Sequence, residues 1–500
     1  MSRLGGLQDK GAPGIAKKRD AAGSRWKPFL RAVFAALVIL YLFAFAGDGL
    51  RAYFTGDDLM NLYHYWSQPL GRILLESVVF FPADILRPLG ALFYGPLFAL
   101  FGLNPLPYRV VCMALLLINL GLLYVFCRRL SGSREAAALA CLIGAYHANL
   151  GDLYYNSGTI YDLLCYTFFY LALIYYIGIR GRGAYPTLRQ TAALTALYIA
   201  ALGSKEMAAT LPVIVAVYEL VYHPPDSWKP GGLLRWSGRN MRFVIAAIPV
   251  TLAYIGSKVT GSNHIFANPA YRPHVTWNAF MTGWRHYLEP LFYNSLQFGR
   301  TRTIVLWIGL LILARLSRRR ELLFAWGIIM AGVLPIIFIE PRGLYGIYLT
   351  LPAWYLFMAT ILTLARDQWV RRARSIPEWT GVEAGQLFLF LAALFLLSPL
   401  HRHQKALAPM STTASEPVRL VQEQILNRYP TMPRGSGVLF LSDPLEPYDY
   451  TLTFLFRLHY RDKDLRVDRV KQLGAAPDAE AQKAYAHIFR YDGGVITALR

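Results

Sequence analysis

Long apolar runs constrain the fold of this chain more than any other feature of its sequence. A helix needs about 20 mostly apolar residues to cross a bilayer. Eleven ranges reach or approach this length, at 29–47, 107–127, 135–150, 158–179, 190–204, 207–221, 243–259, 303–316, 321–339, 344–364 and 382–399. Only 16% of the 500 residues are charged, against about 25% in soluble globular domains. The sequence therefore predicts an α-helical polytopic membrane protein with about 11 spans and excludes a soluble enzyme.

Basic residues between these runs predict the orientation of the chain. Lys and Arg concentrate in the short cytoplasmic loops of membrane proteins. With the basic segment 1–28 placed in the cytoplasm, the inner segments hold 25 Lys and Arg, whereas the longer outer segments hold 9. We therefore expect a cytoplasmic N-terminus and, after an odd number of spans, a periplasmic or extracellular C-terminus. The expected location is the inner (plasma) membrane of a bacterium.

The formal net charge of +21 has the same explanation. A strongly basic chain is typical of nucleic-acid-binding proteins. Here most of the excess positive charge lies in short loops that would face the cytoplasm, where it sets the orientation and meets anionic lipid headgroups. We therefore expect membrane lipids as partners and no nucleic acid.

Loops and a distinct C-terminal part complete the expected domain organisation. The transmembrane domain extends over 29–399, with long outer loops at 48–106 and 260–302. Within the first loop, the apolar stretch 88–101 is too short to span, so we expect a helix that lies in or re-enters the outer membrane face. Residues 400–500 mix charge with short apolar runs of helical and strand-like pattern, which predict a small extracytoplasmic α/β domain.

An acidic pair follows the first span, in the segment Thr55-Gly-Asp-Asp-Leu-Met-Asn61. Adjacent carboxylates raise each other's pKa, and a position at an apolar boundary raises it further. Asp57 or Asp58 is therefore a candidate general base for a sugar or lipid hydroxyl. Gly-Asp-Asp is also a common loop sequence, and composition alone favours a solvated turn.

Other ionisable and aromatic residues fall at the outer ends of the predicted spans. Charge near a bilayer is costly, so such groups tend to be functional. The candidates on this face are Arg87, Asp152, Asp162, Lys205, Glu206, Glu340, Arg342 and Tyr345. Together they supply carboxylates for proton transfer and cations for a phosphate. A Lys-Glu or Glu-Arg pair at a helix end is, however, more often a local ion pair.

A metal site has less support in the sequence. Four histidines fall on the predicted outer side, at His147, His264, His274 and His286. None has the close spacing to a second ligand and a supporting carboxylate that metal sites show. The four cysteines lie in apolar stretches, which excludes a zinc motif or a disulfide framework. We expect that no cofactor is required. Binding of a divalent metal ion is an open alternative that no pattern in the sequence supports.

Three stretches resemble the GT-C glycosyltransferases, a group that includes protein O-mannosyltransferases, aminoarabinose transferases of lipid A and related bacterial lipid-linked sugar transferases. The first is the acidic pair, followed by the Pro-rich segment that ends Leu100-Phe-Gly-Leu-Asn-Pro105 and by a span that ends Tyr124-Val-Phe-Cys-Arg-Arg-Leu130. The second is Ser204-Lys-Glu-Met-Ala-Ala-Thr-Leu-Pro212. The third is Glu340-Pro-Arg-Gly-Leu-Tyr345, followed by Leu351-Pro352 and carrying Pro341 as an insertion. The resemblance covers residues 29–365.

The resemblance implies a GT-C fold and a glycosyltransferase that uses a dolichyl- or polyprenyl-phosphate sugar as donor. It implies inverting transfer of a hexosyl or pentosyl group to a glycan, lipid or protein acceptor on the outer face. Asp57 or Asp58 would be the base, while Lys205 and Arg342 would hold the donor phosphate, with Arg87 a further candidate. Glu206 would orient Lys205. The supporting residues would be Glu340, Asp152, Asp162 and Tyr345.

Two other functions remain as alternatives. A transporter or flippase of lipid-linked saccharides would show internal repeats and charges near the membrane midplane, and neither is visible here. An O-antigen polymerase or ligase would place its functional residues in a middle loop, for which 260–302 is available. The acidic pair after the first span favours the glycosyltransferase.

Overall fold

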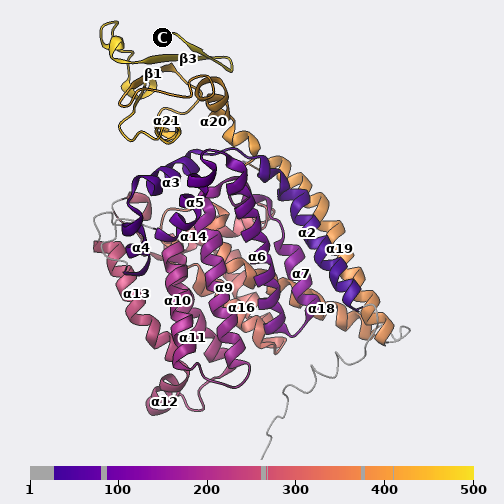
Figure 1. Cartoon of the computed structure of the whole chain (residues 1–500). Helices are drawn as coiled ribbons and strands as arrows, with labels where there is room; N and C mark the ends of the chain where they lie inside the picture. Colours follow the sequence, from indigo (N-terminus) through magenta and orange to yellow (C-terminus); the bar gives the residue numbers. More distant parts are fainter. Residues whose placement is uncertain (1–26, 80–86, 261–265, 267, 373–377, 409) are drawn as a thin grey trace, which may run out of the picture.

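A computed structural model describes residues 27–79, 87–260, 266, 268–372, 378–408 and 410–500. It consists of a helical bundle and a small domain with a β-sheet at one end of that bundle (Figure 1). We call this end of the bundle the sheet end. Most of the predicted cytoplasmic segment 1–28 lies outside the described residues.

Each of the eleven predicted ranges overlaps an α-helix. These helices are α2 (Lys27–Ala46), α6 (Pro105–Ser131), α7 (Arg134–Gly144), α9 (Ile160–Arg180), α10 (Leu188–Ser204), α11 (Leu211–Tyr222), α13 (Arg242–Thr260), α15 (Arg300–Leu316), α16 (Arg320–Gly332), α18 (Leu351–Arg372) and α19 (Glu378–Leu407). Proline shapes some of the boundaries. Pro212 stands in the first turn of α11, where its missing N–H costs no hydrogen bond.

Six segments of the described chain are long and apolar enough to cross a membrane. They are Ala32–Arg51, Pro105–Ser131, Ser157–Arg180, Arg242–Thr260, Arg320–Ile337 and Gly385–Leu407. The other helices in the predicted ranges are shorter or less apolar, so the number of eleven spans stays a prediction.

The described part of the first outer loop contains three α-helices. They are α3 (Gly56–Ser67), α4 (Leu70–Val79) and α5 (Ala91–Phe101). The apolar stretch Pro88–Phe101 is helical and shorter than a span, as its length predicts. Helix α5 packs against α3 and α6.

The second outer loop, predicted as a connection, contains the 15-residue helix α14 (Trp277–Leu291). Thr276 caps its N-terminus by accepting a hydrogen bond from the backbone N–H of Ala279 at 3.1 Å. Its buried residues include Met281, Trp284 and Leu288, which recur with the helical period. Polar residues separate them, so the segment forms an amphipathic helix without a long apolar run.

The C-terminal domain is built on a four-stranded sheet with the order β2-β1-β3-β4. Its elements are α20 (Glu416–Val421), a π-helical turn (Gln422–Leu426), β1 (Gly437–Ser442), α21 (Thr451–Tyr460), β2 (Arg466–Arg469), α22 (Val470–Leu473), β3 (His487–Asp492) and β4 (Val495–Ala498). Strand β1 runs parallel to β2 and β3, and β4 is antiparallel to β3. Helix α19 continues past the predicted boundary at 400 and ends at Leu407, shortly before Pro409, a residue that disfavours helix just before it.

The C-terminal domain contacts the bundle mainly through α3. Helix α21 packs on α3, with the rings of Phe454 and Tyr63 5.4 Å apart. The backbone N–H of Tyr53 donates to Ser415 Oγ at 2.9 Å. These contacts join segments about 360 residues apart in the chain and place the domain beside the acidic pair.

Candidate functional site

The acidic pair lies in the first turn of α3, where a capping box fixes the helix start. The backbone N–H of Asp58 donates to Thr55 Oγ1 at 3.4 Å, and the backbone N–H of Thr55 donates to Asp58 Oδ2 at 2.8 Å. Such reciprocal bonds satisfy two N–H groups that a helix start otherwise leaves unpaired. Asp58 is therefore held as part of the helix cap.

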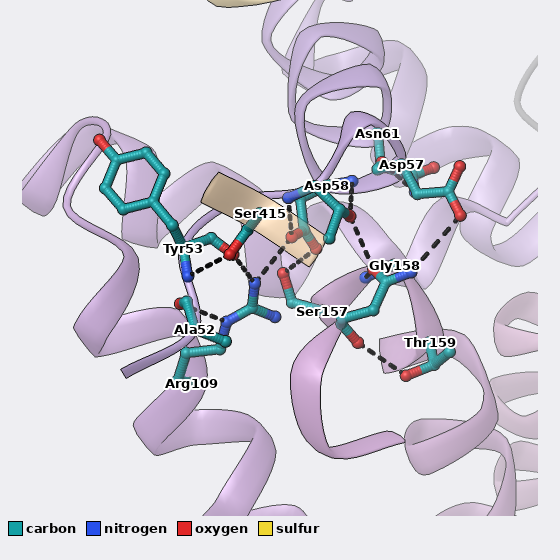
Figure 2. Close-up of polar contacts among 12 residues, drawn as sticks. Ala52, Tyr53, Asp57, Asp58, Asn61, Arg109, Ser157, Gly158, Thr159 and Ser415 are labelled. Atoms are coloured by element: carbon teal, nitrogen blue, oxygen red, sulfur yellow. Dashed lines mark hydrogen bonds and ion pairs between the residues drawn. The ribbon is translucent and has the colours of Figure 1, made fainter. Parts of the chain in front are cut away.

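Asp58 is also fully buried and paired with a cation (Figure 2). Its Oδ2 lies 2.8 Å from Nη2 of Arg109, and its Oδ1 accepts from the Ser157 hydroxyl at 2.5 Å. Arg109, itself buried in α6, donates further to the carbonyls of Ala52 and Tyr53. Both carboxylate oxygens of Asp58 are thus occupied, and the side chain joins α3, α6 and the turn before α9.

Asp57 differs from Asp58 in its exposure to solvent and in its lack of a cation partner among the described residues. Successive side chains on a helix are turned by about 100°, and Figure 2 shows Asp57 pointing away from Arg109. The residue is exposed, and its Oδ2 accepts a hydrogen bond from Asn156 Nδ2 at 3.4 Å. No cation among the described residues forms an ion pair with Asp57.

The pKa of the Asp57 carboxyl is raised above its ordinary value. Desolvation by surrounding protein is the largest cause, followed among the raising effects by the negative charges of Asp58 and Asp449, while the hydrogen bond from Asn156 opposes the shift. Gly158 permits this close packing, because a Cβ there would lie 3.1 Å from the Cβ of Asp57. Asp57 is therefore open to solvent yet easier to protonate than an ordinary aspartate.

The predicted cations at this end are mostly paired with carboxylates. Arg87 Nη2 lies 2.9 Å from Glu206 Oε1, and Lys205 forms a buried ion pair with Asp162. Burial opposes ionisation of Glu206, but the charges of Arg87 and Lys205 lower its pKa to about 2. Each of these adjacent residues forms its ion pair with a residue from another element, so the orientation of Lys205 by Glu206 stays a prediction.

Arg342 is the predicted cation without such a partner. Its Nε and Nη2 atoms are buried and have no hydrogen-bond acceptor among the residues that the structure describes. Its guanidinium carbon lies 4.4 Å from the centre of the Tyr271 ring. The backbone carbonyl of Arg342 lies 2.6 Å from Nε2 of His286, on α14. Arg342 is thus held in place while two of its N–H-bearing nitrogens bond to none of the described residues.

Of the remaining predicted residues, Asp152, Asp162 and Tyr345 lie near the acidic pair and the cations, whereas Glu340 does not contact them in the described part of the chain. The pKa of Asp152 is raised by desolvation and by the charges of Asp57 and Asp162, so the three carboxylates share one region. A Cβ on Gly343 would lie 3.4 Å from Asp152 Oδ2, which places the segment after Arg342 at the same region. The Lys205 ammonium lies 5.1 Å from the centre of the Tyr345 ring. The side chain of Glu340 is exposed and contacts none of them by an ion pair among the described residues.

Hydrogen bonds connect the acidic motif to the cations. Asn61 Nδ2 donates to the carbonyl of Asp57 at 2.8 Å, and the Tyr161 hydroxyl donates to Asn61 Oδ1 at 2.9 Å. The hydroxyls of Tyr161 and Tyr65 are 2.9 Å apart, and Tyr65 donates to the carbonyl of Arg87 at 2.6 Å. The guanidinium of Arg87 lies 5.1 Å from the Tyr161 ring centre. Residues from α3, α9 and the segment before α5 thus form one network.

The C-terminal domain also reaches this region. A Cβ on Gly56 would lie 2.5 Å from Thr451 Oγ1 and 3.9 Å from Asp449 Oδ1. Asp449 accepts from the backbone N–H of Thr451 at 2.7 Å, which fixes the carboxylate beside the start of α3. The negative charge of Asp449 therefore belongs to the surroundings of Asp57.

Sequence reasoning missed Arg109 and Ser157, the two side chains that neutralise and bind Asp58. Arg109 carried a signal, since it is a charged residue within the apolar run 107–127. Ser157 carried none, because a serine in a polar turn is common. No three His, Cys, Asp or Glu side chains among the described residues are placed to hold a metal ion, and His147 bonds the Leu291 carbonyl at 3.1 Å.

Comparisons with known proteins bear on the fold. No protein-family model matches the chain, and no curated protein matches it by sequence. Among solved structures, the chain is similar to ArnT from Cupriavidus metallidurans, which was solved bound to undecaprenyl phosphate. The TM-score is 0.51 and the identity 13%, over 95% of this chain and 98% of ArnT. This likeness and the six apolar segments identify the chain as an integral membrane protein with the fold type that the GT-C resemblance predicts.

Proposed function

We propose that this chain is an inverting glycosyltransferase that transfers a sugar from a polyprenyl-phosphate donor to a hydroxyl of a glycan, lipid or protein acceptor. The proposal rests on the position of a carboxylate and a guanidinium beside the same region. Asp57 is an exposed carboxylate without a cation partner, and Arg342 is a guanidinium with unsatisfied N–H groups, as far as the described residues extend; both border the region of Asp152. The likeness to a structure that holds undecaprenyl phosphate supports a lipid-phosphate donor.

In this proposal Asp57 is the base. It accepts the proton of the acceptor hydroxyl, whose oxygen then forms a bond to the anomeric carbon of the sugar. The bond from that carbon to the phosphate oxygen breaks, and the polyprenyl phosphate leaves with the electron pair. Attack on the face opposite the leaving group inverts the anomeric configuration, so no second carboxylate nucleophile is needed.

Arg342 stabilises the leaving phosphate. Charge develops on the phosphate oxygen as the bond breaks, and an oriented cation in a site of low dielectric stabilises that charge most effectively. Arg87 and Lys205 are engaged with Glu206 and Asp162. Their role is to hold the network around the site, and Arg342 is the cation that contacts the donor.

The sheet end faces the outside in this proposal, and the acceptor reaches Asp57 from there. The distribution of Lys and Arg supports this orientation, with eleven spans and the C-terminal domain outside. A reporter enzyme that is active only in the periplasm, fused after Arg500, tests it directly. Activity of the fusion supports the topology, and its absence, with full activity of a reporter that works only in the cytoplasm, contradicts it.

Release of polyprenyl phosphate is the test of the function. The purified full chain, given polyprenyl-phosphate sugars and an extract of cell-envelope glycans and lipids, releases polyprenyl phosphate in step with labelling of an acceptor. A flippase moves the donor intact and releases none. An O-antigen polymerase or ligase requires a diphosphate-linked oligosaccharide, so use of that donor alone contradicts the proposal.

Replacing Arg342 tests the donor contact. We expect Arg342→Ala to weaken binding of undecaprenyl phosphate roughly 10- to 100-fold, because a charge-assisted hydrogen bond to the phosphate is lost. Arg342→Lys restores part of the affinity. Arg285→Ala is the matched control, since Arg285 is exposed and pairs with Glu289 on α14. Equal affinities of Arg342→Ala and the unmodified chain, measured by titration in detergent, contradict the assignment.

The pH dependence of transfer follows from the raised pKa of Asp57. A base works only when deprotonated, so kcat/KM falls as the pH drops through this pKa, at a pH above the ordinary value of 3.8. The negative charge of Asp449 contributes to the shift. We therefore expect Asp449→Asn to move the acid limb of the pH–rate profile to lower pH. An unchanged limb, or one moved to higher pH, contradicts the assignment of Asp57 as the base.

A further inference from the structure

A cleft of about 380 Å³ opens where the C-terminal domain meets the turn between α5 and α6. The residues that line it include Phe98 and Asn104 from the bundle and Gln422 and Arg461 from the domain. Phe98 packs against Trp66 near the C-terminal end of α3, whereas Asp57 is in the first turn of that helix. The cleft is therefore separate from the candidate catalytic site.

Arg461 has an unusual backbone at the edge of this cleft. It caps the C-terminus of α21 with a φ of +51°, a left-handed conformation in which Gly or Asn is the usual residue. Its guanidinium lies 5.3 Å from the centre of the Phe98 ring, and no carboxylate in the described part of the chain forms an ion pair with it. The sequence thus keeps an unpaired cation where glycine would suit the backbone better.

Two amide side chains add hydrogen-bonding groups to the cleft. Gln422 Oε1 is buried and has no donor among the described residues. Asn104 Oδ1 accepts from the backbone N–H of Leu106 at 3.2 Å, and its NH2 group takes no part in that bond. With Arg461, the cleft offers donors for an anion and one acceptor for a hydroxyl group.

Exposed apolar stripes lead away from the cleft along both helices that border it. Leu92 and Leu100 on α5 are 63% and 75% exposed. Leu106, Val110 and Ile118 on α6 are about half exposed, and their spacing of four and eight residues places them on one face. In a chain that spans a membrane, such faces are covered by acyl chains.

We propose that the cleft binds the headgroup of an anionic glycerophospholipid of the phosphatidylglycerol type. The phosphodiester lies against Arg461 and the Asn104 amide, a hydroxyl of the headgroup donates to Gln422 Oε1, and the acyl chains follow the exposed faces of α5 and α6. The lipid then bridges the C-terminal domain and the bundle. It acts as a structural ligand and takes no part in the transfer reaction.

Native mass spectrometry of the full chain in detergent, titrated with phosphatidylglycerol or phosphatidylcholine, tests this site. Arg461→Gly removes the cation and suits the left-handed backbone, so this variant keeps its fold. Arg318→Gly is a matched control, because Arg318 is exposed and has a φ of +54°. We expect the unmodified chain and Arg318→Gly to retain one phosphatidylglycerol roughly tenfold more tightly than Arg461→Gly does, and Arg461→Lys to lie between them.

Three results would overturn the proposal. The first is retention of phosphatidylglycerol by Arg461→Gly at the affinity of the unmodified chain. The second is complete displacement of the lipid by inorganic phosphate at millimolar concentration, which would identify the cleft as a site for free phosphate. The third is equal retention of phosphatidylcholine and phosphatidylglycerol by the unmodified chain, because the cation would then contribute no selectivity.

Discussion

Asp57→Asn lowers the rate of sugar transfer by roughly 10²- to 10⁴-fold, the range that a positioned general base contributes. Asparagine has nearly the same shape but cannot accept the proton of the acceptor hydroxyl. Asp57 is exposed and forms no ion pair within the described residues, so the thermal unfolding midpoint changes little. Binding of undecaprenyl phosphate stays within about twofold, because Arg342 is untouched. The measurements are release of polyprenyl phosphate, a thermal melt and a lipid titration.

A second exposed carboxylate supplies the control for Asp57. Glu446 lies in the same C-terminal loop as Asp449, and its side chain is exposed. Glu446→Gln removes one negative charge near the sheet end and leaves transfer at the level of the unmodified chain. Transfer by Asp57→Asn at more than about half the normal rate would remove Asp57 as the base. A loss of the same size in Glu446→Gln would show that general electrostatics, and not proton transfer, causes the effect.

Asp58→Ala has a large effect of a different kind, on stability. The substitution leaves the buried guanidinium of Arg109 without its carboxylate and removes the capping box of α3. Breaking a buried ion pair by removing one partner costs about 3–5 kcal/mol. We therefore expect a clearly lower melting temperature and a poor yield of folded protein, and activity falls in proportion to the folded fraction.

A double substitution separates this structural role from catalysis. Replacing both members of a buried ion pair with apolar residues is often tolerated, so Asp58→Leu with Arg109→Met recovers much of the stability lost in Asp58→Ala. The transfer rate per folded molecule then stays within about tenfold of normal. A stable Asp58→Ala protein with no transfer activity would contradict this, since it would give Asp58 the chemical role that we assign to Asp57.

Helices that span a membrane are the part of this fold that the sequence specifies best. The run 107–127 lies within α6, and the run 158–179 lies within α9 apart from its first two residues, because a span is recognisable from length and apolarity alone. Helix α14 was not predicted, since its buried side chains alternate with polar ones and make no long apolar run. Its position matters, because His286 on α14 contacts the carbonyl of Arg342.

The candidate site shows where local sequence stops being informative. The pair Asp57-Asp58 is recognisable in the sequence as a candidate site. Its two members differ because Asp58 pairs with Arg109, which lies 51 residues further along the chain. One local signal was available: threonine three residues before Asp58 is the pattern of a capping box, which indicates the second carboxylate as the cap. Lys205 and Glu206 are neighbours in the chain, yet their ion-pair partners come from other elements, which no spacing rule reveals.

The position of the C-terminal domain on α3 has a consequence for the biogenesis of this protein. A ribosome makes Tyr53 and Asp57 within the first eighth of the chain, whereas Ser415, Asp449 and Thr451, which contact or influence that segment, are made near the end. A chain that has inserted most of its spans therefore still lacks the late-made residues that contact or influence the segment around Asp57. The surroundings of Asp57 should therefore be completed later than membrane insertion, when the last-made domain folds onto α3.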